Sequence, residues 1–334
     1  MISKRKRTFF LFCLPAVFTL AVKETVAVAE NRSDVFTDKA SAGADFGFQG
    51  EYAGSLEIEG QERQFGAQVV ALGDGRFRIV GYEGGLPGDG WNRGDEQTEL
   101  EASLVDGRVV GQVEVATIEI ADDKLKVIAG DNEVGVLDKV NRMSPTLGKA
   151  PPENAIVLFD GSSIDAFENA KLVEGNYLGA TNCYTKEKFG DHFLHIEFRT
   201  PFMPKARGQA RGNSGVYLQS RYEVQVLDSF GLAGKDNECG GIYSISAPNL
   251  NMCFPPLSWQ TYDIDFTAAR YDDDGNKTAS ARVTIKHNGV VIHDDLELKH
   301  GTPGRFKEGP GPEALFLQDH GDPVVFRNIW VALK

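Results

Sequence analysis

The chain has 334 residues, of which 41% are hydrophobic, and a formal net charge of −13 at pH 7. This length and apolar content are sufficient for two packed domains. A strongly acidic balance argues against nucleic acid or an anionic membrane surface as the partner, because both select basic proteins. The composition therefore indicates an acidic globular protein that binds neither.

The N-terminus has the organisation of a secretory signal peptide over residues 1–29. Basic residues at positions 4–7 precede an apolar run over 9–22, and Ala27-Val28-Ala29 is a small-residue cleavage pattern. The apolar run is shorter than the ~20 residues needed to cross a bilayer, and no later segment is long and apolar enough to span one. The sequence predicts a secreted or periplasmic mature protein.

Residues 30–45 are polar and small, which predicts a flexible leader. From residue 46 the pattern changes to short alternating apolar runs divided by turn residues. Seven such runs lie between residues 50 and 131, and Asp-Gly pairs at 74–75 and 106–107 predict tight hairpins. Residues 46–144 are therefore expected to form a small antiparallel β barrel or sandwich.

The segment PTLGKAPPEN, residues 145–154, is interpreted as a linker because Pro151-Pro152 cannot join a sheet ladder and favours an extended spacer. Residues 155–334 then contain strand-like runs at regular spacing and no convincing helical period. Asn288-Gly289 between two of these runs predicts a type I′ hairpin. The pattern predicts an all-β, two-sheet sandwich of jelly-roll type.

The polar residues of the stretch 212–229 are placed on one face by the strand period of two. Its apolar residues predict a core-facing side, and Tyr217, Glu223 and Gln225 fall on the opposite side of the pleat. After an expected bulge, Asp228 would share that surface. Polar side chains gathered in this way on one face of a sheet predict a binding cleft.

Three cysteines remain after removal of the signal peptide, in a compartment that permits disulfides. An odd number cannot all pair within one chain. Cys239 and Cys253 flank one irregular loop and form the preferred pair. The alternative is that these two and Cys183 are all free and buried.

Five sequence segments occur in the order found in one known family. They are LFDGSSIDAF (158–167), FGDHFLHIEFR (189–199), the hairpin GNSGVYLQ with YEVQVLD (212–228), SWQTYDIDF (258–266) and LFLQDHGDPVVFRNIWV (315–331). On these segments, residues 155–334 resemble the 3-keto-disaccharide hydrolase family. The resemblance implies a concanavalin A-like jelly roll that acts on 3-keto-disaccharides or other 3-keto-glycosides.

A 3-keto sugar calls for different chemistry from an ordinary glycoside, because the ketone acidifies the C2 hydrogen. A base can remove that proton, the C1 substituent can leave by elimination, and water can then add back. Gln225 stands where laminarinase-like jelly rolls carry an acid, which argues against a simple pair of carboxylates. The expected catalytic residues are Glu223 or His320 as base and Asp228 as acid; the expected substrate-binding residues are Asn213, Tyr217, Gln225, Trp259, Gln318 and Arg327.

Other interpretations of these residues stay open at this point. Glu223, Asp228 and His320 could instead hold a divalent metal, since mixed carboxylate and imidazole ligands suit several such ions. Arg327 could simply pair with a carboxylate within the sheet. The same sandwich also serves non-catalytic, lectin-like envelope proteins that bind carbohydrate. The expected partner is an oligosaccharide or glycoside in either case, and the oligomeric state is undetermined.

Overall fold

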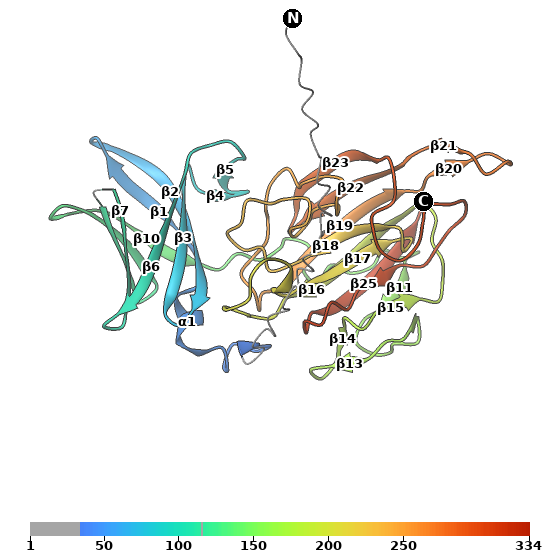
Figure 1. Cartoon of the computed structure of the whole chain (residues 1–334), viewed down its shortest axis with the longest axis horizontal. Coiled ribbons are helices and arrows are strands. Elements are labelled where there is room, and N and C mark those ends of the chain that lie inside the picture. Colours follow the sequence, from blue (N-terminus) through green and yellow to red (C-terminus); the bar gives the residue numbers. More distant parts are fainter. Residues whose placement is uncertain (1–33, 115) are drawn as a thin grey trace, which may run out of the picture. The chain divides into compact units, whose positions relative to one another are not determined.

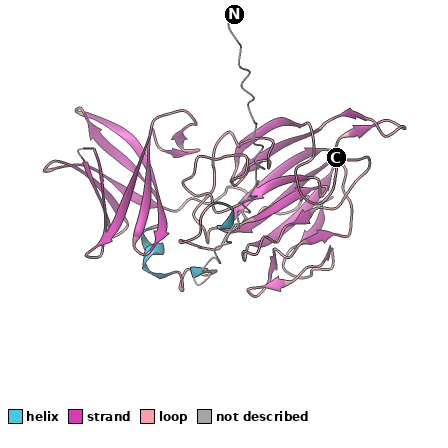
Figure 2. Ribbon diagram, viewed as in Figure 1, coloured by secondary structure: helices cyan, strands magenta, loops and turns pink. Residues whose placement is uncertain are grey.

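The computed structural model describes residues 34–114 and 116–334, and β-strands dominate the described chain (Figures 1 and 2). The expected signal peptide, residues 1–29, lies outside the described residues. Within them, no helix is both long enough and apolar enough to cross a bilayer.

The expectation of a flexible leader is wrong for residues 34–45. Phe36 exchanges backbone hydrogen bonds of 3.0 and 2.9 Å with Phe202, and helix α1 spans Gly43–Phe48. The ring of Phe46 lies 5.1 Å from the ring of Phe202. Phenylalanines in an otherwise polar stretch find apolar partners here, which composition alone does not reveal.

The first domain is a closed eight-stranded antiparallel barrel, with neighbour order β1-β10-β9-β8-β7-β6-β3-β2 (Figure 1). This resolves the choice between barrel and sandwich. The barrel closes through β10, which pairs with β1 and is absent from the seven expected runs. The strands are β1 Gly50–Ile58, β2 Gln61–Gly73, β3 Arg76–Glu83, β6 Gln97–Val105, β7 Arg108–Val113, β8 Ala116–Ala121, β9 Lys124–Ala129 and β10 Asn132–Val140, with the short β4 Leu86–Pro87 and β5 Gly90–Trp91 in the β3–β6 connection.

The two expected Asp-Gly hairpins are confirmed in the barrel. Asp74 and Gly75 have φ values of 56° and 68°, and Asp106 and Gly107 have 50° and 79°. Two successive positive φ angles are the requirement of the type I′ turn, whose twist matches that of the flanking strands.

The second domain is a two-sheet sandwich, as expected. The larger sheet has the order β13-β14-β25-β16-β19-β22-β23 with β11 paired to β25, and the smaller one has the order β12-β15-β24-β17-β18. Its strands are β11 Ile156–Phe159, β12 Phe167–Glu168, β13 Leu172–Val173, β14 Tyr177–Gly179, β15 Cys183–Thr185, β16 His192–Arg199, β17 Ser214–Leu218, β18 Tyr222–Val226, β19 Gln260–Thr267, β22 Ala281–His287, β23 Val290–Leu298, β24 Phe316–Leu317 and β25 Val325–Leu333; β20 Arg270–Tyr271 and β21 Lys277–Ala279 form a separate hairpin, and a 3-10 turn spans Gly208–Ala210.

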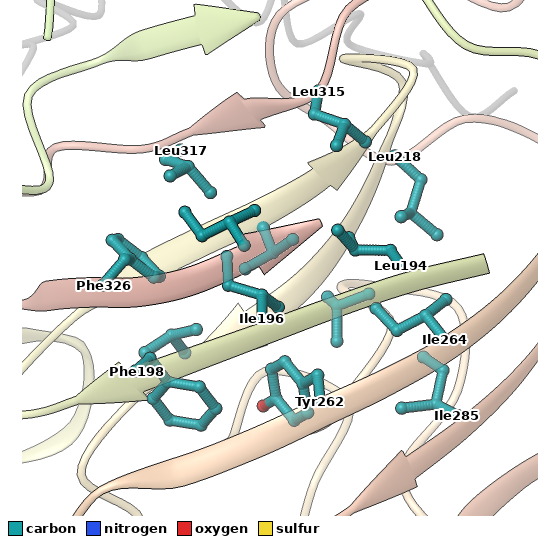
Figure 3. Close-up of a cluster of buried hydrophobic side chains, with 14 of the residues drawn as sticks. Leu194, Ile196, Phe198, Leu218, Tyr262, Ile264, Ile285, Leu315, Leu317 and Phe326 are labelled. Atoms are coloured by element: carbon teal, nitrogen blue, oxygen red, sulfur yellow. The ribbon is translucent and has the colours of Figure 1, made fainter. Parts of the chain in front are cut away.

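Apolar side chains from both sheets fill the space between them (Figure 3). Ile196 and Phe198 of the larger sheet and Leu218 and Leu317 of the smaller one belong to this core, and each is at most 2% exposed. Asn288 and Gly289, with φ values of 49° and 84°, form the expected type I′ hairpin between β22 and β23.

The segment 145–154 is not a free spacer, because it packs on the outer face of the larger sheet. The Thr146 hydroxyl donates a 2.6 Å hydrogen bond to Asp263, and the Gly148 amide donates one of 2.5 Å to Glu197. Trp330 donates from its indole nitrogen to a backbone oxygen of this segment at 3.2 Å.

The preferred disulfide between Cys239 and Cys253 is not formed. In the described part of the chain Cys183, Cys239 and Cys253 are all free and buried, which agrees with the alternative expectation. All three belong to the sandwich core.

Candidate active site

The hairpin β17–β18 presents its polar side chains on the outer face of the smaller sheet. Gln219 and Ser220 form its turn with φ values of 52° and 53°, which sets Tyr217 directly opposite Glu223. The alternate residues of both strands lie in the core between the sheets, so the predicted division of faces is confirmed. These alternate residues are Val216, Leu218, Val224 and Val226.

Glu223 is a buried carboxyl group with a perturbed pKa. The residue is only 4% exposed, and burial raises its pKa from the ordinary 4.5 to about 7, against the opposing effect of a hydrogen bond from the Tyr217 hydroxyl. Burial and the neighbouring Glu223 charge also raise the pKa of Tyr217, which therefore keeps its proton. The pair combines a carboxyl group that titrates near neutrality with a permanent hydrogen-bond donor.

Two glycines allow the backbone to approach this pair closely. A Cβ atom on Gly215 would lie 2.5 Å from Glu223 Oε1, and one on Gly304 would lie 2.5 Å from Tyr217 Cε1. The Thr302 side chain also holds β18 in place, since its hydroxyl accepts a 2.9 Å hydrogen bond from the Glu223 backbone amide. A side chain at either glycine would displace the pair.

The same face continues with donors and aromatic rings. Gln318, just after β24, donates from Nε2 to the Tyr217 hydroxyl at 3.2 Å. The Arg305 guanidinium lies 4.2 Å from the centroid of Tyr184 and 4.8 Å from that of Phe316. Aromatic surfaces beside a few polar groups are the composition of a sugar site.

Arg305 and Tyr184 were not expected as site residues. Arg305 lies in a connection, residues 299–315, without a strand period, and Tyr184 lies on a short strand, β15. Only the pairing of β15 with β24 and of β24 with β17 brings them beside Tyr217. A basic residue within a glycine-rich connection was the one available sequence signal.

Asn213 and Gln225 have a structural role beside the Tyr217–Glu223 pair. The Gln225 Nε2 donates to Asn213 Oδ1 at 2.8 Å and to the backbone oxygens of Ser214 and Val226. Asn213 and Gln225 are each 1% exposed. Their expected contact with substrate hydroxyls is not supported, because these amides already have protein partners.

Asp228 does not share the surface of Glu223. It follows the end of β18, is 2% exposed, and accepts a 2.7 Å hydrogen bond from Arg211 Nε in a buried ion pair. No group of three or more His, Cys, Asp or Glu side chains that could hold a metal ion occurs among residues 34–114 and 116–334. The ion pair with Arg211 does not support the expected acid role of Asp228, and the described residues do not bring Glu223, Asp228 and His320 together as a metal-ligating set.

Arg327 and Trp259 lie on the outer face of the larger sheet, away from Glu223. Arg327 donates to the buried Glu197 at 2.7 Å, and its guanidinium lies 4.0 Å from the centroid of Trp259. The core separates this cluster from the smaller sheet. The expectation that both bind substrate beside Glu223 is wrong, whereas the alternative pairing of Arg327 with a carboxylate is confirmed.

His320 is exposed, two residues after Gln318.

The model of the "3-keto-alpha-glucoside-1,2-lyase-like domain" family matches residues 154–332. The chain belongs to this family. The lyase-like domain thus covers the sandwich except for the last residue of β25, and the resemblance inferred from the five segments is confirmed.

Two solved structures from Parabacteroides distasonis ATCC 8503, each called a "putative glycosyl hydrolase", are similar to part of this chain. The first, at 2.13 Å resolution, is 34% identical; the match covers 55% of this chain and 85% of that one, with a TM-score of 0.50. The second, at 1.70 Å resolution, is 18% identical and the match covers 54% and 93%, with a TM-score of 0.37. No curated protein matches the chain.

Proposed function

We propose that this protein cleaves glycosides of 3-keto sugars by 1,2-elimination followed by hydration. The observation that carries the proposal is the buried carboxyl group of Glu223, whose pKa of about 7 and hydrogen bond from Tyr217 suit a general base near neutral pH. The family description supports the 3-keto substrate and the 1,2-lyase chemistry. The description of the 34% identical relative supports action on glycosidic bonds.

In the proposed first step, the Glu223 carboxylate takes the proton from C2 of the sugar. The electron pair of the C2–H bond moves toward the C3 ketone, which becomes an enolate. The enolate then forms the C1–C2 double bond as the C1–O bond breaks, and the leaving oxygen takes a proton from water. In the second step hydroxide adds at C1, and Glu223, whose proton exchanges with the solvent between the two steps, gives a proton back to C2. The net reaction consumes one water.

Donors beside Glu223 supply the electrostatic part of the proposed mechanism. Tyr217 stays protonated and donates its one proton to Glu223; once Glu223 has taken the proton from C2, this hydroxyl can donate to the ketone oxygen instead. Gln318 fixes the orientation of the hydroxyl with a 3.2 Å hydrogen bond. Arg305 brings a positive charge to the aromatic rings of the same face. Donors aimed at the ketone oxygen stabilise the enolate as its charge develops. The rings of Tyr184 and Phe316 provide an apolar surface for the sugar.

Isotope incorporation tests the proposed mechanism directly. The protein is incubated in D₂O with a 3-keto-glucoside and, separately, with the unoxidised glucoside. The proposal expects release of the aglycone from the keto substrate alone, with deuterium at C2 of the released 3-keto sugar. Cleavage without deuterium at C2 would point to direct displacement. Saturable binding of the keto substrate without cleavage would instead favour the lectin-like alternative.

We further propose that the mature protein works outside the cytoplasm, because residues 1–29 have the pattern of a cleavable signal peptide. Mass spectrometry of the protein from the extracellular or periplasmic fraction of its host should give a mature N-terminus at Glu30. An intact N-terminus in a cytoplasmic fraction would contradict this.

A further inference from the structure

The interior of the β barrel contains a row of small residues across three neighbouring strands. Ala67 on β2 lies opposite Gly81 on β3, and Gly81 lies opposite Thr98 on β6. Ala67 and Gly81 alternate along their strands with outward residues and share the inward side with Val69 and Ile79 of the barrel core. A Cβ atom on Gly81 would meet only the Thr98 carbonyl oxygen, at 3.9 Å. Space is therefore left inside the barrel at this level.

The small residues line a mostly apolar cavity of about 160 Å³. An apolar cavity of ~150 Å³ in a protein interior is large enough for a benzene molecule, and eight-stranded barrels can hold one small ligand. The apolar lining of the cavity in this barrel consists of the buried Leu56, Ala67, Ile79, Ile118, Leu125 and Leu137 and the half-buried Phe65, Leu100, Val113 and Val127.

Large side chains fill the barrel interior at the α1 end. At the α1 end, Tyr52 and Phe77 are fully buried, the Phe48 ring lies 5.9 Å from that of Phe77, and the Tyr52 hydroxyl donates to the Phe48 carbonyl oxygen at 2.8 Å. At the other end, polar residues lie at the rim of the cavity. These are Glu83, Glu96, Gln97 and Thr98.

The polar rim limits the chemistry of a ligand. The Glu83 carboxylate already pairs with Arg63 at 2.8 Å, so its charge is compensated and it can accept a hydrogen bond from a neutral group. Thr98 adds a hydroxyl on the same strand row as the cavity-lining Gly81. The apolar lining excludes a charged ring substituent, because burying an unpaired charge is costly.

We propose that the barrel binds one neutral molecule of single-ring size, a phenol or a cyclic alcohol. The ring lies among the aliphatic side chains, and the hydroxyl points to Glu83 and Thr98 at the rim. This site is independent of the sugar chemistry assigned to the lyase-like domain. A phenol-sized ligand fits the cavity, whereas a long acyl chain exceeds its volume.

Fluorine NMR of 4-fluorophenol with the mature full-length protein tests this binding. We expect saturable broadening and shift of the fluorine signal, competition by p-cresol, weaker binding of fluorobenzene, and no binding of 4-fluorobenzoate. Absence of 4-fluorophenol binding at millimolar concentration would overturn the proposal, as would equal binding of the benzoate.

Graded filling of the cavity supplies the decisive variants. Binding of 4-fluorophenol should weaken progressively through the series Gly81→Ala, Gly81→Val and Gly81→Leu. Both Gly81→Leu and Ala67→Leu should weaken it at least tenfold. The melting temperature should not fall, because the added atoms occupy existing space. Gln112→Leu, at an exposed outward position of β7, should bind as the wild type does. Unchanged binding in the filled variants would refute the site. Unfolding of the whole series would show that the space does not exist.

Discussion

Replacing Glu223 by Gln separates its proposed catalytic role from its cost to the fold. The amide keeps the shape of the side chain and can still accept the hydrogen bond of Tyr217, but it cannot take a proton from C2. Loss of a general base costs about 10²- to 10⁴-fold in rate. We expect a fall in kcat of this order, with little change in binding of the 3-keto-glucoside.

The same substitution should stabilise the protein at alkaline pH. The pKa of Glu223 is about 7 in the folded protein against the ordinary 4.5, so folding favours the protonated form. The ionised Glu223 carboxylate therefore destabilises the folded protein. This destabilisation is absent below pH 4.5, grows between pH 4.5 and 7, and is complete above pH 7. At 1.36 kcal/mol per unit of pKa, it reaches about 3 kcal/mol. Relative to the wild type, Glu223→Gln should gain about that much stability between pH 4 and pH 8.

Both effects can be measured on the same samples. Steady-state release of the aglycone gives kcat and KM, and urea unfolding at pH 4 and pH 8 gives the free energy of unfolding. Glu168→Gln is the matched control, because Glu168 is exposed on β12 of the same sheet. It should change neither quantity.

The two outcomes test different parts of the reasoning. Undiminished kcat in Glu223→Gln would remove Glu223 from the role of base. A stability difference that does not depend on pH would show that burial does not raise the pKa of this carboxyl group. In the wild type, kcat/KM should rise with pH through about 7 as Glu223 loses its proton.

Three further predictions concern neighbouring and remote groups. Tyr217→Phe removes a hydrogen bond that lowers the pKa of Glu223, so the midpoint of the pH–rate profile should move up by about one unit; an unmoved midpoint would argue against this hydrogen bond. Gly215→Ala places a Cβ 2.5 Å from Glu223 Oε1 and should lower kcat about 10²-fold. Gly190→Ala is the control, because a Cβ at Gly190 has no neighbouring atom within 4 Å and should leave kcat unchanged. Equal kcat in the two variants would rule out the close approach of Gly215 to Glu223. Burial opposes ionisation of Glu197, but its hydrogen bonds hold the pKa at about 2 against the ordinary 4.5. The stability advantage of the wild type over Glu197→Gln should therefore be present above pH 4.5 and shrink by up to about 3 kcal/mol as the pH falls through 2. Urea unfolding measures this advantage, and a difference that stays constant with pH would contradict the prediction.

Much of the local structure could be predicted because it depends on neighbouring residues in the chain. The Asn288-Gly289 turn needs only two residues that tolerate positive φ. The division of β17 and β18 into a core face and a site face follows from the strand period, so Tyr217 and Glu223 could be assigned together. Gln318 could be added because its segment matches the family in order and spacing.

The site predictions for Arg327 and Trp259 failed because they depend on which sheet each strand joins. Gln318 follows β24 in the smaller sheet, whereas Arg327 lies on β25 in the larger one, although nine positions separate them. The chain crosses between the sheets there, so Arg327 joins Trp259 rather than Glu223. The position of Asp228 was missed for a related reason, since its partner Arg211 is brought close only by the fold.

The sequence by itself determined the all-β class, the hairpin turns, the family and the candidate base, because these follow from local periodicity, turn chemistry and ordered motifs. Only the tertiary structure decided the pKa of Glu223, the close approach of Gly304 and the row formed by Ala67, Gly81 and Thr98. Burial, backbone proximity and strand register arise from residues far apart in the chain, and no local pattern records them.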